Sequence, residues 1–337
     1  MLAEAVREVA PQELALVCGG ALPGLGAGAT RLITDVREEA IAGERCVPFS
    51  FAEDPALDGR FTAAVVWPRA HLGKDFSLAC IARAGLLLQP GGRLLCAVRK
   101  NKGGASLARE IERLVGNLTT LQRDRGYSLY CGEAQGPIDR EAASALLGAR
   151  YAIDEPLLGA PPLLATPGVF SRKHLDRGTR ALILHAAQLA TTGTLGEPRR
   201  ILDLCAGLGP LGLWAARRWP DAVITAVESN LLAIACLKAN TAARGLDGPP
   251  PRLRIEAADG LAKLSLPSFD LALVNPPTHA GEDELRGLLA PLPGLLRGGL
   301  ALFVVNREGR LVGLLEELSA AIEIAAVPGF SIVSARW

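Results

Sequence analysis

Short apolar runs alternate with stretches of helical periodicity along most of the chain. The runs at 61–66 and 269–274 are apolar at nearly every position, which is typical of strands buried in a parallel sheet. Segments such as 107–114 instead repeat apolar residues three and four positions apart, which indicates amphipathic helices. Strands that alternate with helices predict the α/β class, with an open and mostly parallel sheet in each half of the chain.

The two halves of the chain repeat each other. Segment 61–71 aligns with 269–279 without a gap, and both contain Phe, Val, Pro and His at matching positions. Three further pairs of segments correspond: 90–98 with 297–305, 16–20 with 203–207, and 33–37 with 224–228. Chance similarity between two α/β domains is the alternative, but we interpret the repeat as a tandem duplication. Residues 1–150 then form the first domain and residues 151–337 the second.

The polar residues suited to binding a ligand occur only in the second half. In this alignment the second half has Asp203, Glu228 and Asn275, and the first half has Leu16, Arg37 and Trp67. The first domain is therefore interpreted as a degenerate copy that is retained for structure or for substrate recognition.

Two features of the first half need an interpretation. Trp67 is interpreted as simply filling a vacant pocket. The basic residues Arg93, Arg99, Lys100 and Lys102 either bind phosphates or belong to a solvated loop.

An asparagine and two prolines end one apolar run of the second half. Asn275, Pro276 and Pro277 follow 269–274 directly. The strand has to end there because proline cannot donate to a ladder and fixes its own φ. Open α/β sheets bind ligands at the carboxyl ends of their strands. The Asn275 side-chain oxygen and a proline carbonyl are therefore placed to accept the two hydrogens of a planar NH2 group, although a tight turn explains the same residues.

A glycine loop follows the strand expected at 200–204. Gly207, Gly209 and Gly212 lie between this strand and the next helical pattern. Glycines let a ligand approach the backbone, and a helix N-terminus offers free N–H groups. The spacing satisfies G-x-G-x-x-G, which alone is a weak indication of a nucleotide site.

Three acidic residues distinguish between two classes of cofactor. Glu228 ends a strand and is placed to bind ribose hydroxyls, and Asp259 follows another strand and is placed to bind an adenine amine. Asp203 would repel the pyrophosphate of a dinucleotide, but it suits S-adenosylmethionine, which carries a sulfonium and an ammonium. The alternatives are that Asp203 only organises the loop, that Glu228 is a solvated strand end and that Asp259 forms an Asx turn.

The composition restricts which partners the protein can bind and in which cellular compartment it is expected. A chain of 337 residues that is 49% hydrophobic can build two cores. The net charge of +1 gives no global field for a polyanion, so any nucleic-acid surface has to be local. The seven cysteines form no C-x-x-C pair and there are only four histidines, so we expect no metal site and a reduced, cytoplasmic setting. We expect neither a membrane span nor a secretory signal.

These motifs together resemble the class I S-adenosylmethionine-dependent methyltransferases, and more narrowly the RsmC-type ribosomal RNA guanine-N2 methyltransferases of the methyltransferase small domain family. The resemblance includes Gly168-Val169-Phe170-Ser171, the segment 175–179 and Asn275-Pro-Pro with His279 and Gly281. It covers most of 60–132 and 165–337. It implies two tandem Rossmann-like class I methyltransferase domains, the N-terminal one degenerate.

The resemblance also implies a set of site residues. The catalytic residues are Asn275, Pro276 and Pro277, the substrate-binding residues are Thr278 and His279, and the cofactor-binding residues are Phe170, Asp203, Cys205, Gly207, Gly209, Glu228, Ser229, Asp259 and Asn275. The family has an aromatic residue at position 278, where it stacks on the target base. Thr278 cannot stack, so another residue supplies the aromatic face, the substrate differs, or activity is reduced. His279 either lines the base pocket or is a structural turn residue, like His71 in the degenerate copy.

The function that the resemblance implies is methyl transfer from S-adenosylmethionine to the N2 amine of a guanine in ribosomal RNA, with the small subunit favoured. The protein would act as a monomer on ribosomal RNA or on the small ribosomal subunit. Three alternatives stay open: methylation of another planar nitrogen (adenine N6 or a protein amide), a nucleotide-dependent oxidoreductase, and a non-catalytic RNA-binding or assembly factor.

Overall fold

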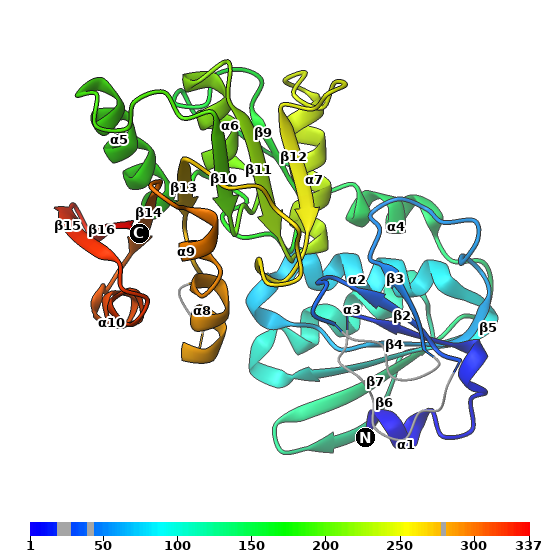
Figure 1. Ribbon diagram of the computed structural model, residues 1–337. Coiled ribbons are helices and arrows are strands. Elements are labelled where there is room, and N and C mark those ends of the chain that lie inside the picture. The colour runs from blue at the N-terminus through cyan, green and yellow to red at the C-terminus, as the bar shows by residue number, and fades with distance from the viewer. Residues whose placement is uncertain (19–27, 39–43, 278–280) are drawn as a thin grey trace. The chain divides into compact units, whose positions relative to one another are not determined.

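A computed structural model describes residues 1–18, 28–38, 44–277 and 281–337. The chain divides into two compact units (Figure 1). Unit 1 comprises Met1–Arg150 with Thr166–Gly168, and unit 2 comprises Tyr151–Ala165 with Val169–Trp337. None of the helices in the described ranges combines the length and the hydropathy that a membrane crossing requires.

Unit 1 contains four α-helices, three short 3-10 helices and seven strands in its described part. The helices are α1 (Leu2–Ala5), η1 (Pro11–Glu13), η2 (Ala70–Leu72), α2 (Lys74–Leu87), η3 (Lys100–Lys102), α3 (Gly104–Leu114) and α4 (Arg140–Leu147). The strands are β1 (Leu14–Val17), β2 (Thr30–Ile33), β3 (Arg45–Pro48), β4 (Phe61–Val66), β5 (Leu88–Arg99), β6 (Thr119–Asp124) and β7 (Tyr127–Glu133).

Unit 2 contains six α-helices and nine strands in its described part. The helices are α5 (Arg177–Thr191), α6 (Pro210–Arg218), α7 (Leu231–Ala242), α8 (Glu282–Leu289), α9 (Leu292–Leu295) and α10 (Gly309–Glu317). The strands are β8 (Tyr151–Ile153), β9 (Leu163–Ala165), β10 (Arg200–Leu204), β11 (Val223–Glu228), β12 (Leu253–Ala257), β13 (Leu271–Val274), β14 (Leu300–Val305), β15 (Ala321–Val327) and β16 (Phe330–Arg336).

Both units have a seven-stranded sheet with the same topology. The strand order is β3-β2-β1-β4-β5-β7-β6 in unit 1 and β12-β11-β10-β13-β14-β16-β15 in unit 2 (Figure 1). In each sheet the first five strands of this order are parallel and the last two pairings are antiparallel. The predicted α/β class with two mostly parallel sheets is confirmed. In unit 2 the order reverses between β10 and β13, which is where such sheets bind ligands.

The buried core of unit 2 holds the strand ends in place. All four residues of β13 are buried, and the core includes Leu202 of β10, Phe303 of β14 and Leu292 of α9. Burying a side chain of this size contributes about 1.5–3 kcal/mol. Because the strands β10, β13 and β14 are buried along their length, the positions of the polar residues that follow them are fixed by the core.

The repeat is visible in the strand register. Leu16 pairs with Val65 in unit 1, and Asp203 pairs with Leu273 at the corresponding place in unit 2. The strand β1 is followed by Cys18 with φ of +53°, as β10 is followed by Cys205 with φ of +61°, a conformation that residues other than glycine rarely adopt. Trp67 therefore stands where unit 2 has Asn275, as the alignment predicts.

The register also corrects one part of the sequence alignment. Asp203 pairs with the residue two positions before Glu228, and Leu16 pairs with the residue two positions before Ile33. The position of Glu228 is therefore occupied by Ile33 in unit 1, and the predicted match with Arg37 is wrong. The strand β2 ends at Ile33, whereas 224–228 lies inside β11, so the two similar segments occupy different places in their sheets. Unit 1 still lacks a carboxylate at this position.

Candidate functional site

The glycine loop after β10 has the backbone that the sequence predicts. Gly207 has φ of +56° and Gly209 has φ of +87°, and Pro210 then begins α6. A Cβ atom on Gly209 would lie 2.2 Å from Cδ1 of Leu237 on α7. Gly209 is thus required both by its backbone conformation and by the close approach of a neighbouring helix.

We expect the substitution Gly209→Ala to destabilise unit 2. A left-handed φ costs a non-glycine residue about 1–3 kcal/mol, and the clash with Leu237 adds overpacking strain of similar size. Urea unfolding should show a loss of about 2–6 kcal/mol. The control is Gly287→Ala on α8, where a Cβ atom meets nothing within 4 Å. An unfolding midpoint for Gly209→Ala equal to that of the control would contradict this account.

Asp203 lies at the end of β10 and is completely buried. Its Oδ2 accepts a hydrogen bond of 2.7 Å from the backbone N–H of Gly212 in α6. Its Oδ1 is buried and has no hydrogen-bond partner among the described residues. Burial raises the pKa of Asp203 to about 7, the Gly212 N–H opposes this, and the negative charge of Glu228 adds to it. An unpartnered buried carboxylate oxygen is the feature that a cationic ligand would satisfy.

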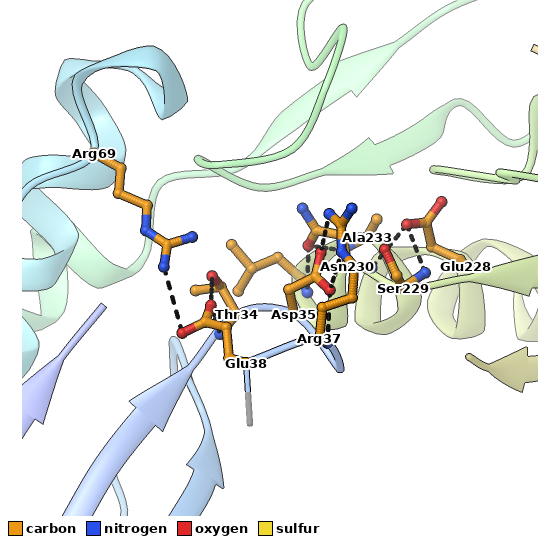
Figure 2. Close-up of polar contacts among 10 residues, drawn as sticks. Thr34, Asp35, Arg37, Glu38, Arg69, Glu228, Ser229, Asn230 and Ala233 are labelled. Carbon is orange, nitrogen blue, oxygen red and sulfur yellow. Dashed lines mark hydrogen bonds and ion pairs between the residues drawn. The ribbon is translucent and has the colours of Figure 1, made fainter. Parts of the chain in front are cut away.

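Glu228 joins the glycine loop to the start of α7. Its Oε2 accepts from the N–H of Gly207 at 2.7 Å, and its Oε1 accepts from the N–H groups of Ser229 at 2.9 Å and Asn230 at 2.7 Å. Figure 2 shows this carboxylate beside Ser229 and Asn230. Asn230 in turn caps α7 by accepting from two backbone N–H groups. Glu228 is therefore held in a defined orientation and is not simply a solvated strand end.

Asp259 follows β12 at the same edge of the sheet. Its side chain is exposed, and it forms no hydrogen bond within the described ranges. The predicted alternative of an Asx turn before Gly260 has no hydrogen bond to support it. The neighbouring Ala258 donates its N–H to the backbone oxygen of Glu228 at 3.0 Å, which places Asp259 next to the end of β11.

Asn275 is oriented by two side chains from the beginning of α5. Its Nδ2 donates to Oδ2 of Asp176 at 3.1 Å and to Oγ1 of Thr179 at 2.8 Å. Asp176 also caps α5 by accepting from the N–H of Thr179 at 2.8 Å. Both hydrogens of the Asn275 amide are thereby used, and its remaining polar atom is the acceptor Oδ1. These contacts orient the side chain so that its acceptor atom is available to a ligand, which the bare Asn-Pro-Pro motif does not establish.

Asp176 and Thr179 were not predicted as functional residues. They belong to the segment 175–179 that carries the family resemblance, but no role followed from it. The pattern of an Asp three residues before a Thr is an N-cap signal, so the sequence predicts a helix start here. It does not reveal that the cap also contacts Asn275.

The remaining predicted site residues differ in their burial and in whether the structure describes them. Pro276 is buried and Pro277 is exposed after the end of β13. Phe170 lies in the loop between β9 and α5 and is 70% exposed. Thr278 and His279 lie outside the described residues. The structure thus places Asp203, Glu228, Asp259 and Asn275 at the carboxyl ends of four neighbouring strands.

The donor set at this edge fits a cationic cofactor with a ribose and an adenine better than a diphosphate. Carboxylates end or follow three of the four strands β12, β11, β10 and β13. A diphosphate on the glycine loop would face the buried Asp203 and would be repelled by it in its ionised form. A sulfonium or an ammonium group near the unpartnered Oδ1 would instead stabilise the charged carboxylate.

Comparison with known protein families agrees with this geometry. The family model of the methyltransferase small domain matches residues 161–334. The chain belongs to this family. Membership contradicts the alternative of a nucleotide-dependent oxidoreductase.

Two curated relatives indicate a narrower group. Ribosomal RNA small subunit methyltransferase C of Pseudomonas paraeruginosa (strain DSM 24068 / PA7) is 30% identical over 288 residues, covering 82% of this chain and 80% of that protein. Ribosomal RNA large subunit methyltransferase G of Ectopseudomonas mendocina (strain ymp) is 30% identical over 267 residues, covering 74% of this chain. The aligned part spans 64% of that second relative.

A solved structure shows the same pair of domains. The T. thermophilus 16S rRNA N2 G1207 methyltransferase (RsmC), solved in complex with AdoMet and guanosine, superposes with a TM-score of 0.80. The two are 25% identical, and the match covers 96% of this chain and 88% of the other. With the small domain match and the curated relatives, this similarity confirms that the chain is of the RsmC type, as its motifs predict.

Proposed function

We propose that this protein transfers a methyl group from S-adenosylmethionine to the exocyclic N2 amine of a guanine in small-subunit ribosomal RNA. The observation that carries the proposal is the oriented acceptor Oδ1 of Asn275, next in the sheet to the buried, unpartnered Oδ1 of Asp203. One of these groups suits a flat amine and the other suits a cation. Relatives named as ribosomal RNA methyltransferases support the substrate class.

The residues at the strand ends have distinct tasks in this proposal. Bound S-adenosylmethionine supplies an electrophilic methyl group. Asp203 balances its positive charge, Glu228 binds the ribose and Asp259 binds the adenine amine. The side chain of Phe170 and the loop residues Cys205, Gly207, Gly209 and Ser229 complete the cofactor-binding surface.

Asn275 and the proline carbonyl after it orient the acceptor amine. The guanine amine is a poor nucleophile because its lone pair is delocalised into the ring. Oδ1 of Asn275 accepts one hydrogen and the carbonyl of Pro276 accepts the other, while Pro277 keeps the backbone rigid. The amine lone pair then points along one direction, and catalysis rests on positioning and electrostatics. A base in folded RNA has to leave its stack to reach such a site.

The proposal extends to the setting of the reaction. The protein acts in the cytoplasm, as a monomer, on ribosomal RNA or on the assembled small subunit. Thr278 and His279 contact the target base. The first domain is the structural and substrate-recognition part, and residues 151–337 form the catalytic domain.

Nucleoside analysis tests the proposed reaction directly. The protein is incubated with methyl-labelled S-adenosylmethionine and, in separate reactions, with small and large ribosomal subunits that lack the modification. We expect label in N2-methylguanosine from the small subunit. Label in a methylated adenosine or in protein would show that the acceptor is not a guanine amine. Label from the large subunit alone would favour the activity named for the second curated relative. Cofactor binding without any label would favour a non-catalytic assembly factor.

We expect Thr179→Val to lower kcat and to leave the KM for the cofactor nearly unchanged. The substitution keeps the shape of the side chain but removes the Oγ1 acceptor of the Asn275 amide. Losing one hydrogen bond of this kind costs about 0.5–1.5 kcal/mol, which corresponds to about a 2- to 12-fold change. Thr179→Ser should restore kcat because it restores the hydroxyl.

The matched control is Thr191→Val on the same helix. The hydroxyl of Thr191 donates to the backbone oxygen of Ala187 at 2.9 Å and is exposed. It should leave kcat unchanged. Equal losses of kcat in Thr179→Val and Thr191→Val would show that the effect comes from α5 as a whole and not from the orientation of Asn275.

A further inference from the structure

The first domain has a cavity at the place that corresponds to Asn275 and the two prolines after it in the second domain. It has a volume of about 230 Å³ at the carboxyl end of β4 and β5. Trp67, Tyr127, Arg99 and Lys102 are among its lining residues. Trp67 is 43% exposed, so it borders an open cavity and does not fill a vacant pocket. A cavity of this size with an exposed indole suits a flat ring the size of a nucleobase.

Uncompensated positive charge surrounds this cavity. A second hollow of about 380 Å³ shares Arg99 with the first and is also lined by Lys100 and Arg125. None of Arg99, Lys100, Lys102 and Arg125 forms an ion pair within the described ranges. Residues 91–109 contain no acidic residue at all, although the whole chain is almost neutral. The nearest acid in the hairpin is Asp124, which immediately precedes Arg125.

Arg99 links the aromatic and the basic parts of this surface. Its guanidinium carbon lies 5.2 Å from the centre of the Tyr127 ring, and its Nε donates to the Tyr127 hydroxyl at 2.9 Å. These contacts hold the planar guanidinium in one orientation and leave its two terminal nitrogens to donate elsewhere. Such a fixed guanidinium suits two oxygens of a phosphate.

Within the described residues, the same edge of the first domain lacks the acids that the second domain has at Asp203 and Glu228. Ile33 stands at the position of Glu228, as the strand register shows. Next to it, Glu38 is engaged internally: its Oε1 accepts from the hydroxyl of Thr34 at 2.7 Å, and its Oε2 pairs with Arg69 at 3.5 Å (Figure 2). Asp35 is likewise paired with Arg37, so the carboxylates near this edge are compensated by arginines, in contrast to the unpartnered Oδ1 of Asp203, and the degenerate copy suits a ligand of a different class.

We propose that this surface binds one nucleotide of single-stranded RNA, with the base stacked on Trp67 and the flanking phosphates on Arg99, Lys100, Lys102 and Arg125. The proposal rests on the proposed function, because it takes RNA as the substrate of the second domain. Stacking on an aromatic face is tolerant of sequence, and the basic residues follow the backbone. The degenerate domain would thereby hold RNA without discriminating among bases.

The test measures equilibrium binding of a short fluorescein-labelled oligouridylate to the full chain by anisotropy, without cofactor. We expect Trp67→Ala to weaken binding by about 5- to 150-fold, the range for a lost base–aromatic stack. Trp67→Phe should keep most of the affinity because it keeps an aromatic face. The matched control is Arg60→Ser, an exposed residue before the opposite end of the same strand β4, and it should bind as the wild type does.

Salt dependence tests the phosphate contacts. The combined substitution Arg99→Gln and Lys102→Gln should reduce the slope of log affinity against log salt concentration by about 1.4, or about 0.7 for each lost phosphate contact. An unchanged slope would remove these residues from the site. Equal binding by Trp67→Ala and the wild type, or no binding by the wild type, would overturn the proposal. Displacement by polyglutamate as readily as by unlabelled RNA would assign the surface to an acidic protein and would also overturn it.

This outcome is separable from that of the nucleoside analysis. Methylation of ribosomal RNA with binding that does not depend on Trp67 would refute the nucleotide site and leave the proposed function intact. Binding that depends on Trp67 without any methylation would support the site and refute the proposed function.

Discussion

We expect the substitution Asn275→Ala to abolish methyl transfer and to change the affinity for S-adenosylmethionine by only a few-fold. Removing one preorganised group that acts on the reacting centre typically lowers kcat by about 10²- to 10³-fold. The amide of Asn275 is held by Asp176 and Thr179, so its oxygen is oriented before the substrate arrives. Single-turnover incorporation of label into small subunits measures the loss, and calorimetric titration measures cofactor affinity.

Two further variants separate the role of the oxygen from a general loss of structure. Gln188→Ala removes an exposed amide from α5 and should leave transfer unchanged. Asn275→Asp keeps an acceptor but loses both hydrogens that bond to Asp176 and Thr179, and its new charge faces the Asp176 carboxylate. We expect it to be as inactive as Asn275→Ala. Full activity of Asn275→Ala would refute the acceptor role, and full activity of Asn275→Asp would refute the orienting role of Asp176 and Thr179.

The location of the candidate site was predictable from the sequence. Apolar runs of parallel strands end abruptly at polar residues, and the carboxyl ends of such strands meet at one edge of the sheet. Asp203, Glu228, Asp259 and Asn275 each follow or end a run of this kind. Local pattern and general topology were therefore sufficient to bring these four residues together.

The orientation of the site residues was not predictable. Asn275 is fixed by Asp176, which is 99 residues earlier in the chain, and no spacing rule reports such a contact. The unpartnered Oδ1 of Asp203 depends on how α6 packs over β10. The mismatch between Arg37 and Ile33 has a related cause, because local similarity shows neither where a strand ends nor the register that the ladder sets. The exposure of Trp67 likewise follows from packing and not from its place in the repeat.

The affinity for S-adenosylmethionine should increase as the pH rises toward 7 and then level off. The pKa of Asp203 is raised to about 7 because its carboxyl is buried, so the ligand-free protein holds a proton there at lower pH. A cationic ligand requires the ionised form. Well below the pKa, the apparent Kd should therefore rise up to tenfold for each unit by which the pH falls. Calorimetric titration of the cofactor between pH 5 and pH 8 measures this slope.

Stability without cofactor should change in the opposite direction. The pKa of Asp203 is higher in the folded protein than its ordinary value of 3.8, so the folded state binds more protons than the unfolded chain between about pH 4 and pH 7. The free energy of unfolding therefore falls as the pH rises through this window, by up to about 4 kcal/mol for a shift of this size.

Asp203→Asn tests both effects at once. The amide keeps the shape of the side chain and an oxygen for the Gly212 N–H, but it has no charge to lose or gain. At pH 8 the ligand-free variant should be more stable than the wild type and should bind S-adenosylmethionine much more weakly, with no dependence on pH between 5 and 7 from this residue. A variant that binds as tightly as the wild type, with the same pH profile, would mean that the buried carboxylate serves only to hold α6 against β10. If Asp203→Asn is both more stable without ligand and weaker in binding S-adenosylmethionine, the cost of burying an ionised acid in the ligand-free protein is the source of its affinity for a cation.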